Sequence, residues 1–302
     1  MAYGKRRMDV CRLSCLIVLL AMGAGTARAA DEILVLGDSW GFATAPALQQ
    51  VLDDNGHANV DVVNEAVPGD TAANLSNPTG LQGIGSDLAA HPNTVLVHLS
   101  IGGNDFLGSW DASMNPAQED ALFDRIVADI ETIVLHIGSE RPDVAILLPS
   151  YDYPRPLPLG TPLEVNTAAE ELASRVQALA DSIPGATFEN SNGLMQLHFG
   201  FPTLGIPPFD PSLPRLDLPS PEEAFSDLIH LTAEGYVLFA DELFDRFYGP
   251  ALGSGVEPVP ALPEAAGWIL GVLLVATRVA SRAYIRRSAR GRASAPSLDA
   301  SL

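Results

Sequence analysis

Apolar runs that suit buried strands alternate along this chain with segments of helical periodicity. Five such runs occur, at 33–36, 60–67, 94–103, 144–151 and 186–190. The first run, ILVL, is continuously apolar, which indicates a strand that is covered on both faces. Strands separated by helices predict a parallel sheet with helices on both of its sides.

Between these runs, apolar side chains recur at helical spacing. The expected helices cover residues 42–54, start at Pro116 behind an Asn115 cap, follow a Thr167-x-x-Glu170 capping box, and run from Thr232 to about Tyr248. Two proline-rich stretches, 151–163 and 199–222, interrupt the alternation. We expect these stretches to form loops or lids near a site.

The central part of the chain is strongly acidic. Residues 30–264 hold 35 Asp and Glu residues against six Arg and no Lys, a net charge of about −29. Such a surface repels phosphate backbones, which argues against a nucleic-acid partner. Hydrophobic residues make up 47% of the 302 residues, so the chain can bury a substantial core.

Residues 1–29 are typical of a signal peptide. Basic residues precede the apolar stretch CLIVLLAMGAG, and ARA then forms a small-x-small cleavage site that ends at Ala29. Both cysteines, Cys11 and Cys15, lie inside this segment, so the mature chain is expected to have no disulfide and no cysteine metal site. These features predict an exported protein, periplasmic or at the cell surface.

The C-terminal region places a Pro/Gly-rich linker at 251–264, a hydrophobic segment at 265–284 and a basic tail at 285–302. One interpretation is a last core helix with a basic tail. The order of linker, apolar segment and arginine cluster favours a membrane anchor with its cations on the cytoplasmic side. The uninterrupted apolar run, 265–277, is shorter than the roughly 20 residues that span a membrane, so spanning requires extension to about Tyr284.

This segment also resembles the PEP-CTERM class of bacterial sorting tags, which combine a short proline motif, an apolar helix and terminal arginines. The motif here is VPALPE, which departs from the usual Pro-Glu-Pro order. The resemblance implies the membrane and a sorting or processing protease as partners. It also leaves two states open, in which the protein is either anchored or released after the tail has been removed.

Polar motifs stand at the ends of predicted strands and before the last predicted helix. Gly37-Asp38-Ser39 follows the first strand, NEAVPGDT (64–71) ends the second, GGND (102–105) ends the third, and DLIHLTAEGY (227–236) precedes the helix. Gly-Asp-Ser alone is ordinary turn chemistry. Because ligands of open α/β sheets bind outside the carboxyl ends of the strands, the motifs together predict a site.

The residue types in these motifs suit nucleophilic catalysis. Asp227 and His230 are three residues apart, so within one helical turn the carboxylate can fix the imidazole tautomer. His230 could then take the proton of Ser39 while Asp227 stabilises the imidazolium. The backbone N–H groups of Ser39 and Gly69 and the side-chain amide of Asn104 could stabilise an oxyanion.

Gly-Asp-Ser near the mature N-terminus, Asn…Gly-Asp-Thr, Gly-Gly-Asn-Asp and Asp-x-x-His near the end resemble the SGNH (GDSL-like) hydrolase family, over residues 32 to about 248. The resemblance implies an α/β fold, a flavodoxin-like three-layer α/β/α sandwich with a mainly parallel five-stranded sheet, in a catalytic domain at 30–250. Trp40 stands where the family pattern has leucine, which is expected to reshape the mouth of the pocket.

The same resemblance implies a serine esterase or acylhydrolase that uses neither a cofactor nor a metal. Residue by residue, it implies Ser39 as nucleophile, His230 as base, Asp227 as the partner of the base, and Ser39, Gly69 and Asn104 as the oxyanion hole. Lipid or short-chain acyl esters and O-acetyl groups on a polysaccharide remain open as substrates. The alternative from another class is a non-catalytic cell-surface carbohydrate-binding or adhesion module with this fold.

Overall fold

The five apolar runs form the strands of one parallel sheet. The computed structural model describes residues 30–253, so the predicted signal peptide, hydrophobic segment and basic tail lie outside it. The strands are β1 (Asp31–Gly37), β2 (Val60–Asn64), β3 (Thr94–Ser100), β4 (Ala145–Pro149) and β5 (Ala186–Glu189). Several strands end earlier than predicted, because the residues beyond them turn out of the sheet into loops.

The spatial order of the strands is β2-β1-β3-β4-β5, and every neighbouring pair is parallel. From β1 the chain moves outward to β2, then crosses back to β3 and continues in the opposite direction. The order therefore reverses between β1 and β3. In an open α/β sheet this switch point leaves a crevice at the carboxyl ends of the two strands, where ligands bind.

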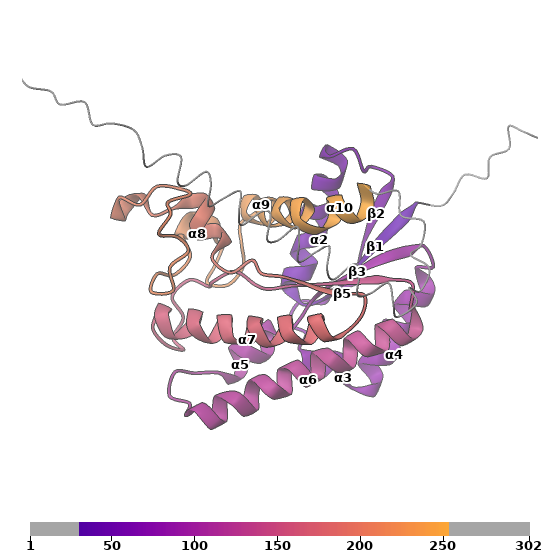
Figure 1. Ribbon diagram of the computed structural model, residues 1–302, viewed down its shortest axis with the longest axis horizontal. Helices are drawn as coiled ribbons and strands as arrows, with labels where there is room; N and C mark the ends of the chain where they lie inside the picture. Colours follow the sequence, from indigo (N-terminus) through magenta and orange to yellow (C-terminus); the bar gives the residue numbers. More distant parts are fainter. Residues whose placement is uncertain (1–29, 254–302) are drawn as a thin grey trace, which may run out of the picture.

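Helices cover both faces of the sheet, as the sequence predicts (Figure 1). One layer contains α2 (Ser39–Asp54), α9 (Ala233–Leu243) and α10 (Gly249–Gly253). The other contains α3 (Ala72–Ser76), α4 (Pro78–Ala90), α5 (Gly103–Ser109), α6 (Pro116–Glu140) and α7 (Pro162–Ser182). A short helix, α8 (Leu194–Phe199), lies beyond the end of β5.

Successive side chains of β1 enter two different cores. Ile33 and Val35 pack with α2 and α9, whereas Leu34 and Leu36 pack with the helices of the opposite layer. All four side chains are almost completely buried. A strand points alternate side chains to opposite faces, so a continuously apolar strand is the sequence pattern that two covered faces require.

Two predicted helix starts differ from the structure. Helix α2 begins at Ser39 rather than at residue 42, because the Asp38 side chain accepts the Trp40 N–H at 2.9 Å and caps the helix there. Helix α7 begins at Pro162 behind Thr161, which forms a capping box with Glu164. The prediction of a start at Thr167 was therefore wrong, since a complete capping box with proline at the first helical position occurs one and a half turns earlier.

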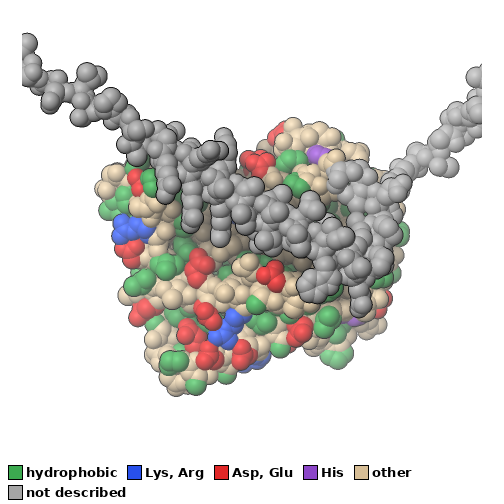
Figure 2. Space-filling view, viewed as in Figure 1, with side chains coloured by type: hydrophobic (Ala, Val, Ile, Leu, Met, Phe, Trp, Pro, Cys, Tyr) green, Lys and Arg blue, Asp and Glu red, His purple; other side chains and the backbone are tan. Residues whose placement is uncertain are grey.

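Acidic side chains are spread over the face of the molecule shown in Figure 2, among few basic ones. Arg175 of α7 bridges the two long helices of this layer by pairing with Asp120 and Asp124 of α6 at 2.6 and 2.7 Å. It also pairs with Glu171 on its own helix. One arginine thus neutralises part of a carboxylate cluster that would otherwise push α6 and α7 apart. No helix within residues 30–253 is both long and apolar enough to cross a membrane.

His98 lies in the centre of the sheet and is completely buried. Its Nδ1 atom is 2.7 Å from the hydroxyl of Tyr248, so this buried histidine has a hydrogen-bond partner in the core. Burial lowers the pKa of His98 to about 4. The unfolded chain, with an ordinary histidine pKa of about 6.5, therefore binds this proton between pH 6.5 and 4 while the folded protein does not.

His98 should therefore destabilise the fold as the pH falls from about 6.5 toward 4. We expect wild type to lose about 2–3 kcal/mol more unfolding free energy than His98→Gln between pH 7.5 and pH 4.5, measured by urea denaturation. Buried Asp38 and Asp152, whose pKa values burial raises to about 6 and about 7, act in the opposite direction, but they are present in both proteins. Equal acid losses in the two proteins would show that His98 does not titrate in this way.

Candidate active site

The first predicted motif forms a tight turn between β1 and α2. Gly37 has a φ angle of +120°, and a Cβ atom there would lie 1.9 Å from the carbonyl oxygen of Ser100, so only glycine fits. This close approach lets the Asp38 N–H donate to the same oxygen at 2.9 Å, joining the ends of β1 and β3. Ser39 becomes the first residue of α2, where its own N–H has no acceptor within the helix.

The structure brings Ser39, His230 and Asp227 together. The Oγ atom of Ser39 lies 2.8 Å from Nε2 of His230, and Nδ1 of His230 lies 2.7 Å from Oδ2 of Asp227. An ionised carboxylate can only accept, so Nδ1 carries the proton and Nε2 is left to accept the hydroxyl proton of Ser39. This is the tautomer that a general base next to a nucleophilic serine requires.

Asp227 and His230 do not lie in the single helical turn that their spacing suggested. They lie in a bend before α9, and the other carboxylate oxygen of Asp227 accepts the backbone N–H groups of Ile229 and His230 at 2.8 and 2.7 Å. Burial acts to raise the pKa of Asp227, but the hydrogen bonds from His230 and these N–H groups outweigh it and hold the pKa below its ordinary value. The aspartate therefore both shapes the loop and stays ionised.

The predicted oxyanion donors lie on neighbouring segments. Asn104 is the second residue of α5, and its Nδ2 atom donates to the carbonyl oxygen of Asp70 at 2.8 Å, which leaves the second amide proton for another acceptor. Next to it, Asp105 accepts the Ala72 N–H at 2.7 Å, which is a structural role for that carboxylate. Together they hold the loop that contains Gly69, whose φ angle is +90°.

Trp40 is buried, with an exposed fraction of 5%, and lines the pocket beside Ser39. Its expected effect on the shape of the pocket mouth stays a prediction. Its Nε1–H donates to the carbonyl oxygen of Ile229 at 2.9 Å, and its ring packs edge-to-face against three aromatic rings. Trp40 therefore ties the loop of His230 to the helix of Ser39, which no sequence pattern had indicated.

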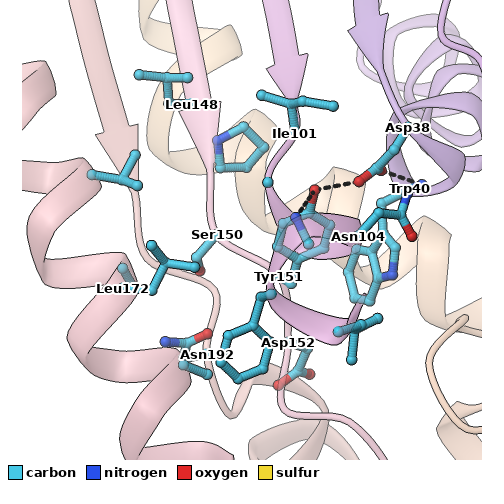
Figure 3. Close-up of a pocket in the computed structure, with 18 of the residues that line it drawn as sticks. Asp38, Trp40, Ile101, Asn104, Leu148, Ser150, Tyr151, Asp152, Leu172 and Asn192 are labelled. Atoms are coloured by element: carbon cyan, nitrogen blue, oxygen red, sulfur yellow. Dashed lines mark hydrogen bonds between the residues drawn. The ribbon is translucent and has the colours of Figure 1, made fainter. Parts of the chain in front are cut away.

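Tyr151 was missed by the sequence reasoning, although it lies in the proline-rich stretch expected near the site. Its hydroxyl donates to Oδ2 of Asp38 at 2.5 Å and accepts the N–H of Gly103 at 3.1 Å (Figure 3). Burial raises the pKa of Asp38 to about 6, although the bonds from Tyr151 and Trp40 favour its charged form. One side chain thus joins the nucleophile turn to the segment that carries Asn104.

A cavity of about 100 Å³ opens at this site. Ser39 and Asn104 line it, and Tyr151, Asp152 and Pro154 of the first proline-rich stretch contribute to its wall, as expected of a loop near the site. In Figure 3, Tyr151 lies beside Asn104, with the aliphatic side chains of Ile101 and Leu148 above it in this view.

The second proline-rich stretch, 199–222, supplies none of the described residues that line the cavity. Buried Gln196 and Asn166 bind its backbone instead: the Gln196 amide donates to the carbonyl oxygens of Arg215 and Leu218, and the Asn166 amide donates to that of Leu218 as well. The stretch is therefore fixed against α7 and α8. His198 packs edge-to-face on Phe209 and does not line the cavity either.

In residues 30–253 there is no group of three or more His, Cys, Asp and Glu side chains placed to hold a metal ion.

The fold and the polar groups at its switch point define an α/β protein with a serine, a histidine and an aspartate in hydrogen-bonded series. The family model for the GDSL-like lipase/acylhydrolase family matches residues 26–238. The chain therefore belongs to this family of ester hydrolases. A search of curated proteins found no match.

Solved structures with a similar fold include three esterases. A carbohydrate acetylesterase from Sinorhizobium meliloti is 17% identical, with a TM-score of 0.48 over 73% of this chain and 99% of that one. An aryl esterase from M. smegmatis is 18% identical, with a TM-score of 0.47 over 73% and 99% of the two chains. A carbohydrate esterase of family 3 from Talaromyces cellulolyticus is 12% identical, with a TM-score of 0.49 over 73% and 97%.

The bridging hydroxyl of Tyr151 can be tested by removing it. Tyr151→Phe keeps the ring but breaks the link between Asp38 and Gly103, so the oxyanion donors should be held less firmly. We expect kcat for p-nitrophenyl esters to fall about tenfold, a typical effect of one lost positioning hydrogen bond of about 1.4 kcal/mol, with KM changed less than twofold. Loss of this bond also raises the pKa of Asp38 further, so any acid limb of the kcat–pH profile that depends on Asp38 should move to higher pH.

Tyr153→Phe is the matched control. Its hydroxyl donates to Glu170, away from the nucleophile turn, and Tyr153 is outside the set of residues that line the cavity. This variant should keep the wild-type kcat and pH profile. Equal effects of the two substitutions would contradict a specific role for Tyr151.

Proposed function

We propose that this chain is a serine ester hydrolase in which Ser39 is the nucleophile, His230 the base and Asp227 its partner. The observation that carries the proposal is the series of hydrogen bonds, 2.8 and 2.7 Å long, that joins these three side chains beside the cavity. The series has the order and donor directions of a catalytic triad. Its residues come from opposite ends of the domain, so local turn chemistry does not account for it.

In the proposed reaction, Ser39 Oγ attacks the ester carbonyl carbon and gives its proton to Nε2 of His230. The carbonyl oxygen becomes an oxyanion that the Ser39 N–H and the free amide proton of Asn104 stabilise, with the N–H of Gly69 as third donor. His230 then passes its proton to the leaving alkoxide, and the acyl group remains on Ser39. Water, deprotonated by His230, attacks the acyl-enzyme, releases the carboxylic acid and restores the serine.

The exposure of each side chain to solvent determines how it contributes to the proposed reaction. Asp227 is 53% exposed and His230 is 30% exposed, so solvent screens their mutual attraction. Orientation of the imidazole is therefore the main contribution of Asp227, while the N–H of Ser39 and the amide of Asn104 stabilise the charge on the oxyanion. High salt should slow this reaction little, because the hydrogen bonds that join Ser39, His230 and Asp227 are short and direct.

The proposed substrates are carboxylic esters, either lipid or short-chain acyl esters or O-acetyl groups on a polysaccharide. A non-catalytic carbohydrate-binding or adhesion module with this fold is the second candidate. Such a module needs no base hydrogen-bonded to a serine, and the spacing of Ser39, His230 and Asp227 favours the enzyme.

Labelling by a fluorophosphonate separates the enzyme from the binding module. Wild type should be labelled on Ser39 and should hydrolyse p-nitrophenyl esters, whereas Ser39→Ala should be unlabelled and lose at least 10³-fold in kcat while it stays folded. The matched control is Ser150→Ala, because Ser150 also lines the cavity but bonds to Asn190 rather than to a histidine. Full activity in folded Ser39→Ala would rule out the mechanism.

We also propose that the protein is exported and held at the membrane by its C-terminal segment, with a sorting or processing protease able to release it. The support is the sequence of residues 1–29 and 265–302, both outside the described residues. The acidic central body, which holds no lysine, argues against a nucleic-acid partner.

Cell fractionation tests this topology. The mature protein should begin near Ala30 by N-terminal sequencing, and deletion of residues 265–302 should move active protein from the membrane to the soluble fraction. Full-length protein expressed in the same cells is the control. Retention of the truncated protein in the membrane fraction would refute the anchor.

A further inference from the structure

The cavity beside Ser39 is lined mostly by apolar side chains, several of which are almost completely buried. At its mouth lie the half-buried Ser39 and Asn104, and at its far end lie Ile130, Leu148 and Phe188, whose exposed fractions are 2%, 2% and 7%. These three side chains come from α6, β4 and β5, so the cavity extends between the sheet and the layer of the long helices α6 and α7. It leads from the nucleophile into the hydrophobic core.

The buried carboxylates in the cavity wall are already hydrogen-bonded within the protein, whereas the side-chain nitrogen of Asn192 is buried there without a partner. Asp38 accepts from Trp40 and Tyr151, and Asp152 accepts the N–H groups of Gly193 and Met195 at 2.6 and 2.7 Å. Asn192 can bind one hydroxyl, but the several hydroxyls of a sugar ring would lose their water without gaining a partner from these carboxylates, at a cost in binding. A hydrocarbon chain loses nothing by the same transfer and gains by leaving water.

The position of the base decides which half of an ester enters. The leaving alkoxide must lie at Nε2 of His230, because that atom returns the proton. Among the described residues, Ser39 and Asn104 line the cavity and His230 does not. The carbonyl group therefore lies at the cavity mouth with the alcohol on the side of His230, and the group that extends into the cavity is the acyl chain.

Resting on the proposed function, we propose that this cavity is the acyl-chain site and that it selects straight acyl groups of about four to six carbons over acetyl groups and long chains. A dry apolar cavity of about 150 Å³ holds the six carbons of benzene, so a cavity of about 100 Å³ holds about four carbons beyond the carbonyl. Bulky alcohols remain acceptable, because that half of the substrate stays outside.

The kcat/KM values of the full-length protein for p-nitrophenyl acetate, butyrate, hexanoate and decanoate test the proposal. Burial of each methylene group is expected to raise kcat/KM about fourfold until the cavity is full. Butyrate should therefore exceed acetate by about sixteenfold, hexanoate should be near the optimum, and decanoate should fall below it. A profile that is flat, or that is highest for acetate, would overturn the proposal.

Two substitutions on α7 change the depth of the cavity in opposite directions. Ala173→Leu adds three carbon atoms to a buried lining position and should lower kcat/KM for butyrate about tenfold while acetate stays within twofold. Val176→Ala removes two carbon atoms from the lining and should move the optimum to longer chains by about two carbons. Ala178→Leu, the same change at an exposed position of this helix, should leave the profile unchanged.

The outcomes separate this inference from the proposed function. Absence of any ester hydrolysis together with absence of fluorophosphonate labelling overturns both. Hydrolysis and labelling with a chain-length profile that neither Ala173→Leu nor Val176→Ala alters overturns the acyl site alone. If one variant fails to fold, the chain-length profile of the other tests the proposal, because Ala173→Leu should shorten the preferred acyl chain and Val176→Ala should lengthen it.

Discussion

The site depends on the contact between the ends of β1 and β3, where the Asp38 N–H donates to the carbonyl oxygen of Ser100. The contact requires glycine at position 37, since any side chain there would overlap Ser100. From this turn the Asp38 carboxylate caps α2 and receives the hydroxyl of Tyr151. The motif aspartate is thus a structural centre: it orients the helix that carries Ser39 and, through Tyr151, the segment that carries Asn104.

Ser39 has a solvent-exposed, polar environment on one side and a buried, mostly apolar cavity on the other. His230 and Asp227 lie in a bend whose position depends on the indole of Trp40 and on backbone N–H groups bound by Asp227. On the other side of Ser39, the cavity passes into the core between the sheet and the long helices. In the proposed reaction the leaving alcohol departs toward solvent on the side of His230, whereas the alkyl chain binds in the apolar cavity, and the switch point of the sheet brings these two environments next to one serine.

Most of the fold could be predicted from the sequence, because the strands of a doubly covered parallel sheet are continuously apolar and the amphipathic helices repeat at a different period. The pattern of β1, with Ile33 and Leu34 entering different cores, is one example. The start of α7 was predicted at the wrong place because Thr167-x-x-Glu170 and Thr161-x-x-Glu164 both match the sequence pattern of a capping box. Only the proline that follows Thr161 distinguishes the true helix start from the other match. The short helices α3, α5 and α8 were missed, since a helix of one or two turns has too few residues to show a period. The 13-residue helix α4 was missed as well, because only Ile84 and Leu88 of its side chains are buried and its apolar stripe is correspondingly weak.

By itself the sequence determined the alternation of strands and helices along the chain, the acidic body, the residues placed after strand ends, Ser39 and Asn104, and the Asp227–His230 pair before the last helix. These follow from local patterns, which the chain carries without folding. The tertiary structure alone decided that Ser39 and His230, 191 residues apart, lie 2.8 Å from each other, that Trp40 and Tyr151 hold the site together, and that a cavity leads from the serine into the core. Those features depend on long-range packing of side chains, which leaves no period or motif in the sequence to predict it.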